Sequence, residues 1–322
     1  MITVIIPYYQ NKSGILIKAL ASIAAQKSTS MPVHVIIIDD TSPVSAQSEL
    51  KNINSISCSV QIVLQPNGGP GSARNTGLNH APVGTRYIAF LDSDDEWSDD
   101  HLLRAVEALN AGYEFYFTDH YQLKSTIGAF ARAGRIQPSE HPLLVTSQPN
   151  LHAYVGDLLD QIIRGNVIGT STVVYDFLRF SKNRFKIEFT NAGEDYLFWM
   201  DIAHSGAKVA FSSQCEAHYG SGVNIYAGTG WGSDKNLLRI HNEIKYKKLT
   251  CELFPVTDLQ RTHINNSLAL LRTSFAQDLI HRITHRKKIS LYLLSKHWQL
   301  DPLSFLQIPK VIINLIRGNK FN

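Results

Sequence analysis

The sequence is poor in cysteine and contains no long apolar run. Among its 322 residues are three cysteines, Cys58, Cys215 and Cys251. Their scattered positions exclude a zinc-ligand spacing and a disulfide framework, so we expect a chain suited to the reducing cytosol. No stretch approaches the roughly 18 to 20 apolar residues needed to cross a bilayer. We therefore expect a cytoplasmic protein, either soluble or peripheral on the inner face of the cell membrane.

Two further motifs are missing. The first seven residues lack a basic leader and break at Pro7, which predicts a strand instead of a signal peptide. The glycine-rich segment 67–71 is followed by no lysine, so it is not a G-x-x-x-x-G-K-[ST] phosphate loop. It also follows the third predicted strand, not the first, and no G-x-G-x-x-G can be read there. The chain therefore matches neither common nucleotide-binding fingerprint.

The composition favours one large α/β domain with a C-terminal extension. Hydrophobic residues make up 44% of the chain and aromatic residues 10%, enough for a sizeable core. Residues 1–234 carry 16 Lys and Arg against 22 Asp and Glu, whereas residues 235–322 carry 15 against 5. The basic part is thus the C-terminal end, which suits an anionic membrane surface or nucleic acid.

Strands and helices alternate along the first third of the chain. Apolar, β-branched runs predict strands at 3–6, 33–38, 60–64 and 88–91, and helical patterns lie between them. Such alternation predicts a mostly parallel sheet with helices on both faces. Ligands of such sheets bind beyond the carboxyl ends of the strands.

Polar residues occupy four such strand ends. They are Tyr9, Asp40, the glycine-rich loop before Arg74, and the acidic turn Asp92-Ser93-Asp94-Asp95. We expect all four to converge on one crevice. There, Asp40 could accept from the N–H of a base while Asp39 braces the turn, although a plain turn would also use these residues. Glycines let backbone amides approach a ligand closely, and the Arg74 guanidinium suits a diphosphate.

The acidic turn at 92–95 supports two interpretations. Carboxylates that converge at a strand end repel one another, and they suit a hard cation such as Mg²⁺ or Mn²⁺. Alternatively, the turn caps a helix that begins near Ser98, with Asp99 and Asp100 in its first turn. The turn alone leaves both interpretations open.

Four motifs in order resemble the GT-A glycosyltransferases of family 2. They are V-I-I-P-Y-Y at 4–9, I-D-D-T-S at 38–42, G-S-A-R-N at 71–75 and L-D-S-D-D at 91–95. The resemblance implies the GT-A fold over residues 1–234 and an inverting hexosyltransferase that uses a nucleotide donor, usually a UDP-sugar, with a divalent cation at the D-x-D motif. Two residues depart from the usual pattern, since Gln10 replaces a common Asn and Thr41 a common Gly.

The resemblance also implies donor-side roles. Residues 1–120 would bind the nucleotide sugar: Pro7 and Tyr9 line the base pocket, Asp40 binds uracil with Asp39 beside it, Arg74 approaches the diphosphate, Asp92 and Ser93 lie at the ribose or sugar, and Asp94, with Asp92, holds Mn²⁺ or Mg²⁺.

Residues 121–234 would supply the acceptor side and the catalytic base. Glu194 and Asp195 read as a helix N-terminus, where the dipole favours carboxylates, and the resemblance places the base in this pair. Inversion needs a carboxylate opposite the leaving group to take the acceptor's proton. We predict Asp195 as the base, with Glu194 orienting it or binding the acceptor. His218 could reach the diphosphate or metal, although a single histidine at a strand end is more often structural.

The segment 220–233 holds five glycines with Tyr226 and Trp231. A plain linker would be polar, whereas a loop closing over donor and acceptor would use glycine hinges and aromatic sugar-stacking faces. We predict such a loop. The segment is similar to its counterpart in bacterial exopolysaccharide transferases of the succinoglycan-assembly kind.

Residues 235–322 are predicted to be helical and basic. Their charges are either merely solvated or dock the helices at a membrane surface beside a lipid-linked saccharide acceptor. Nucleic acid ranks lower, because no RNA- or DNA-binding motif is present. Two other functions stay open: a sugar-phosphate nucleotidyltransferase, which would need a basic glycine-rich loop after the first strand, and a non-catalytic nucleotide-sugar-binding subunit, which would lack a usable base.

Overall fold

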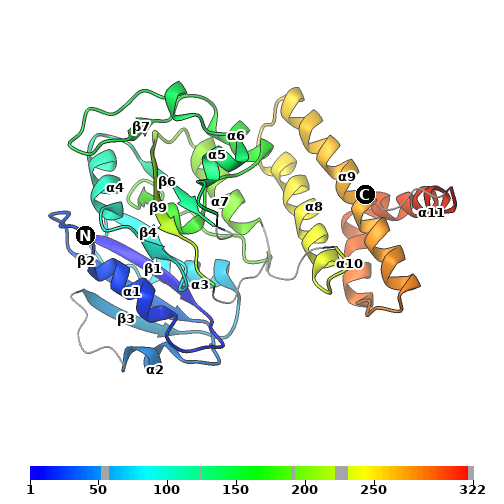
Figure 1. Ribbon diagram of the computed structural model, residues 1–322, viewed down its shortest axis with the longest axis horizontal. Coiled ribbons are helices and arrows are strands. Elements are labelled where there is room, and N and C mark those ends of the chain that lie inside the picture. Colours follow the sequence, from blue (N-terminus) through cyan, green and yellow to red (C-terminus); the bar gives the residue numbers. More distant parts are fainter. Residues whose placement is uncertain (52–57, 123–124, 190–192, 222–230, 318–322) are drawn as a thin grey trace. The chain divides into compact units, whose positions relative to one another are not determined.

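The computed structural model describes residues 1–51, 58–122, 125–189, 193–221 and 231–317 (Figure 1). The chain divides into two compact units. The N-terminal unit comprises Met1–Thr190 and Phe198–Val223, and the C-terminal unit comprises Asn191–Leu197 and Asn224–Asn322.

The N-terminal unit is built on one mixed sheet. Within the described residues the sheet has nine strands, in the order β3-β2-β1-β4-β8-β6-β9-β5, and β7 also pairs with β9. The strands are β1 Ile2–Tyr8, β2 Val33–Asp39, β3 Ser59–Leu64, β4 Tyr87–Phe90, β5 Glu96–Trp97, β6 Phe115–Tyr121, β7 Leu151–Ala153, β8 Val174–Asp176 and β9 Val209–His218. The helices are α1 Leu16–Ala24, α2 Ala46–Leu50, α3 Pro70–Asn79, α4 His101–Asn110, α5 Ala129–Ala133 and α6 Leu158–Arg164, with 3₁₀ turns η1 Pro138–Glu140 and η2 Thr170–Thr172.

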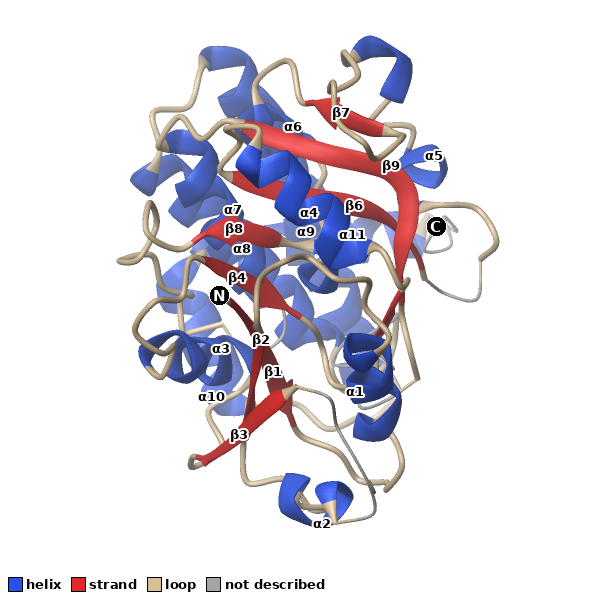
Figure 2. Ribbon diagram, turned by 90° about the vertical axis from the view of Figure 1, so that its left-hand side faces the viewer, coloured by secondary structure: helices blue, strands red, loops and turns tan. Residues whose placement is uncertain are grey.

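Both faces of the parallel part, β3-β2-β1-β4, are covered by helices (Figure 2). Side chains alternate between the faces of a strand. Ile2, Val4 and Ile6 of β1 therefore pack into the core that includes α1 and α4, and Ile36 and Ile38 of β2 pack on the opposite side with Ala73 of α3. The prediction of a sheet with helices on both faces is confirmed.

Two details differ from the sequence prediction. β5 lies between the acidic turn and α4, and it pairs with β9, a strand more than a hundred residues later. The sequence predicts the next strand at 113–118, whereas β6 spans Phe115–Tyr121, and its register with β9 shifts on either side of Asp119. Asp119 and His120 therefore lie inside the strand. Such irregular pairing depends on the partner strand and leaves no local sequence pattern.

The C-terminal unit is helical, as predicted. It contains α8 Asn236–Leu253, α9 Asp258–Thr284, α10 Leu291–Leu300, the 3₁₀ turn η3 Pro302–Gln307 and α11 Ile308–Ile316. α7 Glu194–His204 has its first residues in this unit and the rest in the N-terminal unit. None of the helices in the described ranges is both long and apolar enough to cross a membrane.

A buried histidine lies in the core of the C-terminal unit. The His297 ring stacks on Phe275, with 3.7 Å between the ring centroids, and its Nδ1 lies 3.0 Å from Nδ1 of His241. Burial, with a smaller contribution from His241, lowers the pKa of His297 to about 4. The folded unit therefore holds this ring in its neutral form.

Acid should destabilise this unit through His297. Because the folded pKa lies below the unfolded value of about 6.5, the stability from His297 is complete above that pH and is lost as the pH falls through about 4. Between pH 7 and pH 4, the unfolding free energy of the wild type should decrease by about 2 kcal/mol more than that of His297→Phe. Urea denaturation at pH 7 and pH 4 checks this, and His80→Gln, at an exposed histidine, is the control. An unchanged pH dependence in His297→Phe would refute the account.

Candidate active site

Hydrogen bonds join the predicted strand-end segments. Gln10 follows β1; its backbone N–H donates to Ser42 Oγ at 2.8 Å, and its side-chain amide donates to Ser93 Oγ at 3.0 Å. Gln10 and Ser93 are both buried. The ends of β1, β2 and β4 therefore lie together, as predicted. That these ends line one crevice stays a prediction.

The aspartate pair after β2 organises two loops. Asp39 accepts from the backbone N–H groups of Ser42 and Ala46, both at 2.8 Å, so it braces the following turn. Asp40 accepts from the backbone N–H groups of Gly68 and Gly69 at 2.8 and 2.9 Å. These two amides of the glycine-rich loop therefore bind Asp40. A carboxylate oxygen has a second lone pair, so a contact between Asp40 and uracil stays a prediction.

Thr41 shows why glycine is common at its position. Its φ is 57°, in the left-handed region that a β-branched residue rarely adopts. The Thr41 hydroxyl donates to the carbonyl of Gln65 at 2.7 Å, which helps to hold this conformation. The turn shape is therefore kept although the glycine is absent.

Arg74 is buried and paired. Its side chain is 4% exposed, and Nη2 donates to Asp92 Oδ1 at 2.7 Å, whereas the Asp92 side chain is 36% exposed. In this arrangement Arg74 orients the first aspartate of the D-x-D motif. Contacts of Arg74 with a diphosphate, and of Asp92 with sugar or metal, stay predictions.

The D-x-D segment forms a turn that the hydrogen bonds of Asp95 hold in place. The backbone N–H of Asp95 donates to the carbonyl of Asp92 at 3.0 Å, and its carboxylate accepts from Ser171 Oγ at 2.6 Å and Gly220 N at 2.9 Å. Burial, followed by the neighbouring carboxylates of Asp92 and Asp94, raises the pKa of Asp95 well above its usual range. Asp95 thus connects the turn to η2 and to the chain after β9.

The alternative that the acidic turn caps a helix is wrong. β5 separates the turn from α4, whose N-cap residue is Asp100. The Asp100 carboxylate accepts from Ser98 and Arg104 instead of from the first helical N–H groups. Asp92 to Asp95 therefore serve a different purpose.

The acidic turn fits a cation that is shared with a ligand. Among the residues that the structure describes, no three His, Cys, Asp or Glu side chains are grouped to hold a metal ion by themselves. Mg²⁺ is usually bound by one or two carboxylates together with substrate phosphates, not by an all-protein cage. Asp92 and Asp94 together supply two carboxylates, so these two residues fit such an ion.

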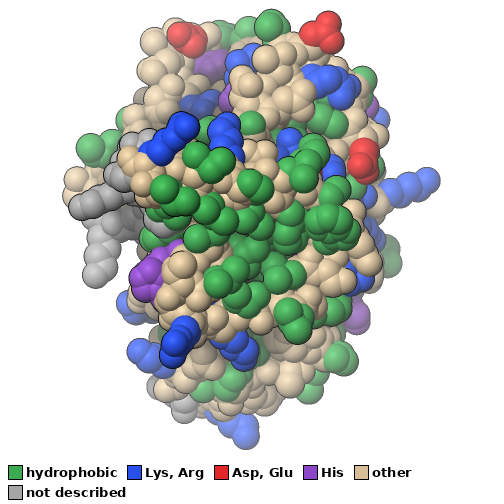
Figure 3. Space-filling view, turned by 90° about the vertical axis from the view of Figure 1, so that its right-hand side faces the viewer, with side chains coloured by type: hydrophobic (Ala, Val, Ile, Leu, Met, Phe, Trp, Pro, Cys, Tyr) green, Lys and Arg blue, Asp and Glu red, His purple; other side chains and the backbone are tan. Residues whose placement is uncertain are grey.

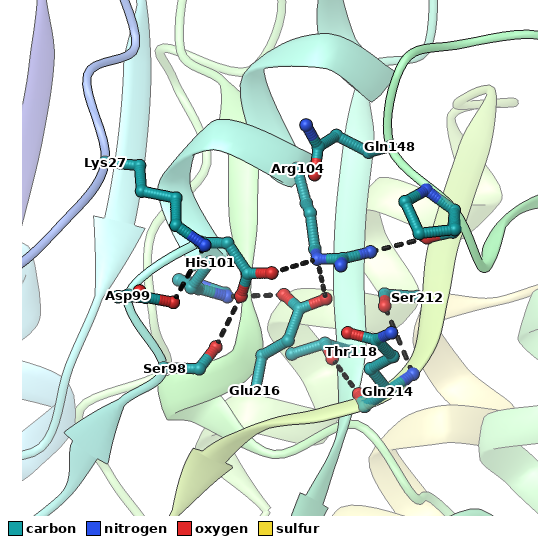
Figure 4. A network of polar contacts seen from close by, with 12 residues as sticks. Lys27, Ser98, Asp99, His101, Arg104, Thr118, Gln148, Ser212, Gln214 and Glu216 are labelled. Carbon is teal, nitrogen blue, oxygen red and sulfur yellow. Dashed lines mark hydrogen bonds and ion pairs between the residues drawn. The ribbon is translucent and has the colours of Figure 1, made fainter.

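A buried ionic network holds β9, the strand that pairs with β5 just after the acidic turn (Figure 4). Glu216 of β9 is fully buried; it accepts from His101 Nδ1 at 3.0 Å and Tyr116 Oη at 2.7 Å, and Arg104 Nε lies 3.6 Å away. Next along β9, Ala217 and His218 pair with Trp97 and Glu96 of β5. The network therefore fixes β9 against the acidic segment, and His218, which is exposed, lies two residues from Gly220. A diphosphate or metal contact of His218 stays a prediction.

Gly220 packs directly against Asp94, the residue predicted to hold the metal ion. A Cβ at this position would lie 1.6 Å from the backbone oxygen of Asp94, so a side chain must displace one of the two segments. We expect Gly220→Ala to reduce sugar transfer roughly 10²-fold, because a displacement of about 1 Å in a catalytic group has that effect. Steady-state rates compared with those of Ser221→Ala, the neighbouring exposed position, check this. A wild-type rate for Gly220→Ala would exclude the proposed role of this turn.

The remaining predicted residues are placed as follows. Pro7 is half-buried in β1, and Tyr9 is exposed after it. Glu194 is buried and Asp195 half-buried in the first turn of α7, within the C-terminal unit, where the Asp195 carboxylate accepts from Tyr196 N at 2.9 Å. Trp231 is exposed and its ring contacts His281. Tyr226 lies outside the described residues.

Two residues of the site were not predicted from the sequence. The residues around Ser171 form no recognisable motif. Its hydroxyl nevertheless donates to Asp95 and accepts from the backbone N–H of Asp92 at 3.0 Å. Gly220 was predicted as part of a loop, but its contact with Asp94 was not. Both lie more than seventy residues from the turn that they hold, and no local signal could have revealed these contacts.

The fold and the site together define a class. The parallel β3-β2-β1-β4 sheet, with aspartates at its strand ends and the D-x-D turn after β4, agrees with the GT-A fold that the four motifs imply. The family model for "Glycosyl transferase family 2" matches residues 3–170. The chain belongs to this family and is a family 2 glycosyltransferase.

Individual relatives agree with this assignment. The chain is 36% identical over 230 residues to the succinoglycan biosynthesis protein ExoW of Rhizobium meliloti (strain 1021), covering 70% of each chain. Among solved structures it resembles S. aureus TarS 1-349 in complex with UDP-GlcNAc, with a TM-score of 0.57, 16% identity, and coverage of 100% of this chain and 93% of that one. It covers 43% of the longer TarS chain.

A further structural relative contains a metal. The mannosyltransferase PcManGT from Pyrobaculum calidifontis, in complex with GDP-Man and Mn²⁺, has a TM-score of 0.57 and 13% identity, with coverage of 99% of this chain and 88% of that one. At these identities, TarS and PcManGT show the shared fold.

Proposed function

We propose that this chain transfers a sugar from a nucleotide donor of the UDP-sugar class to a hydroxyl group of a saccharide, with inversion and with Mn²⁺ or Mg²⁺. The proposal rests on the hydrogen bonds that join the residues at the strand ends. Asp40 holds the glycine-rich loop, and Arg74 holds Asp92 beside Asp94. Such a group at the carboxyl ends of parallel strands is where nucleotide ligands of α/β sheets bind.

The residues would divide the reaction between them. Pro7, Tyr9 and Asp40 would receive the base, and Asp94 would hold a divalent cation whose charge offsets that of the departing diphosphate. Arg74 would keep Asp92 oriented toward the ribose or sugar.

Asp195 would be the catalytic base, with Glu194 beside it. Asp195 would take the proton of the acceptor hydroxyl as that oxygen attacks the sugar carbon. Tyr246 lies near Asp195. Burial, followed by the charges of Glu243 and Asp195, raises the pKa of Tyr246, whose ring packs against that of Tyr196 with 5.6 Å between centroids.

The acceptor in this proposal is a saccharide, lipid-linked, in bacterial surface polysaccharide biosynthesis. Support comes from the relative ExoW, which is named for succinoglycan biosynthesis, and from TarS, which was solved with UDP-GlcNAc. We also place the protein at the inner face of the cell membrane, in contact through its basic C-terminal helices. Trp231, and Tyr226 outside the described residues, would lie in a loop that closes over the sugars.

A donor screen tests the proposal. UDP- and GDP-sugars are added with and without Mn²⁺, and thermal unfolding and release of nucleoside diphosphate are measured. A UDP-sugar should raise the unfolding temperature and be hydrolysed slowly, in both cases with metal only. If no nucleotide sugar stabilises the chain in the presence of metal, the proposed function is wrong.

A further inference from the structure

The C-terminal unit has an apolar surface that its own fold does not cover. Large apolar side chains on α10, η3 and α11 are exposed, and we call this surface the α10–α11 face: Tyr292, Trp298, Leu303, Leu306, Ile313 and Ile316. η3 contacts both α10 and α11, and the rings of Trp298 and Phe305 lie 5.2 Å apart, so these side chains belong to one surface. Figure 3 shows apolar side chains gathered in one area of the surface.

α11 is apolar on more than its inner side. Val311, with Ile308 and Leu315, packs against Ala276 and Ile280 of α9. The other side of the helix carries Ile312, Ile313 and Ile316, the last of which is 80% exposed. Contiguous exposed apolar surface marks an interaction site. The outer side of α11 therefore suits an apolar partner.

Along residues 259–317, which carry the α10–α11 face, the exposed charge has a single sign. Residues 259–317 contain two acidic residues, Asp278 and Asp301. Both are buried and paired, Asp278 with Arg282 at 2.7 Å and Asp301 with Arg272 at 2.8 Å. The exposed charged side chains here are all basic, among them Lys287, Lys288, Lys296, Lys310 and Arg317. These basic side chains form the rim of the α10–α11 face. An anionic partner is therefore complementary in charge to this rim.

We propose that the α10–α11 face docks on an anionic phospholipid bilayer, with Ile313, Ile316 and Trp298 entering the headgroup zone and the surrounding lysines contacting lipid phosphates. This inference rests on the membrane contact proposed above and specifies the surface that makes it. Interfacial helices combine apolar side chains, aromatic residues and Lys or Arg in this way. Lys296 already lies over the Tyr292 ring, 5.7 Å from its centroid, so aromatic and cationic groups share this face.

A second copy of the chain fits the same face less well. A twofold contact through the α10–α11 face would bring each basic rim toward its own copy. Like charges placed against each other across an interface oppose association. A bilayer that carries negative lipids meets both the apolar centre and the basic rim.

Vesicle co-sedimentation of the full chain tests the proposal. The chain should pellet with vesicles rich in phosphatidylglycerol, pellet weakly with pure phosphatidylcholine, and release as salt is raised. Ile316→Asp should reduce the pelleted fraction roughly tenfold, whereas Val83→Asp, at an apolar position in the N-terminal unit that is also exposed, should not change it. Lys310→Glu should reduce it roughly tenfold, and Lys182→Glu, also exposed, should not.

Other outcomes overturn the proposal. Equal pelleting of the wild type and Ile316→Asp, or equal pelleting with both lipids, would exclude this face as the anionic docking surface. A dimer in light scattering that Ile316→Asp converts to a monomer would assign the face to a second copy. Donor binding is measured separately by UDP-sugar thermal stabilisation, which Ile316→Asp should keep. Docking with no donor stabilisation would therefore refute the proposed function alone.

Discussion

Asp94→Ala is expected to lose sugar transfer by roughly 10²- to 10³-fold, the effect of removing one group that stabilises developing charge in a transition state. Asp94 lies in the D-x-D turn, where Asp92 is held by Arg74 and Asp95 by Ser171 and Gly220. The turn should therefore keep its shape when the Asp94 carboxylate is removed. The measurement is the rate of sugar transfer at saturating donor across a Mn²⁺ titration.

Asp99→Ala is the matched control for Asp94→Ala. Asp99 lies five residues later and pairs at the surface with Lys27 at 3.2 Å, with a side chain that is 57% exposed. Removing this carboxylate should leave transfer within about twofold of the wild type, since exposed ion pairs contribute little. Equal rates for Asp94→Ala and the wild type would exclude Asp94 as the residue that holds the cation.

Asp195→Asn is expected to bind donor normally and to transfer 10²- to 10⁴-fold more slowly, the range for loss of a general base. Asparagine keeps the size of the side chain, and the amide oxygen can still accept from Tyr196 N, as Asp195 does at 2.9 Å. Single-turnover transfer and UDP-sugar binding, measured side by side, separate the two steps.

Asp201→Asn, further along α7, controls for charge loss in the same helix. It should transfer at close to the wild-type rate. If Asp195→Asn loses donor affinity in proportion to its rate, Asp195 acts in binding and the base must be sought elsewhere. A rate equal to that of Asp201→Asn would remove Asp195 from the chemistry.

The proposed donor side of the site could be predicted in outline because its segments follow local patterns. β1, β2 and β4 are apolar runs that end in polar residues, and parallel pairing brings those ends to one edge of the sheet. The sequence could not show that both oxygens of Asp40 already accept from the glycine-rich loop. Nor could it show that Arg74 is buried behind Asp92. Both facts depend on loops that meet only in the folded chain.

The acidic turn, too, could be predicted only in part from the sequence. Its composition predicts a cation site but equally a helix cap, and β5 decides between them by separating the turn from α4. β5 is two residues long and exists because β9 pairs with it. Glu216, which is buried between His101 and Tyr116, is likewise an ordinary strand residue in the sequence. Long-range pairing of this kind has no local signature.

Calorimetric titration of UDP, with and without Mn²⁺, into the wild type and Asp94→Asn tests the central claim most directly. Our account predicts that UDP binds the wild type tightly only when Mn²⁺ is present, and that Asp94→Asn loses this metal-dependent gain while Asp99→Asn keeps it. Binding of UDP that is equally tight without metal, and unchanged in Asp94→Asn, would contradict the assignment of the D-x-D turn as a cation-assisted donor site.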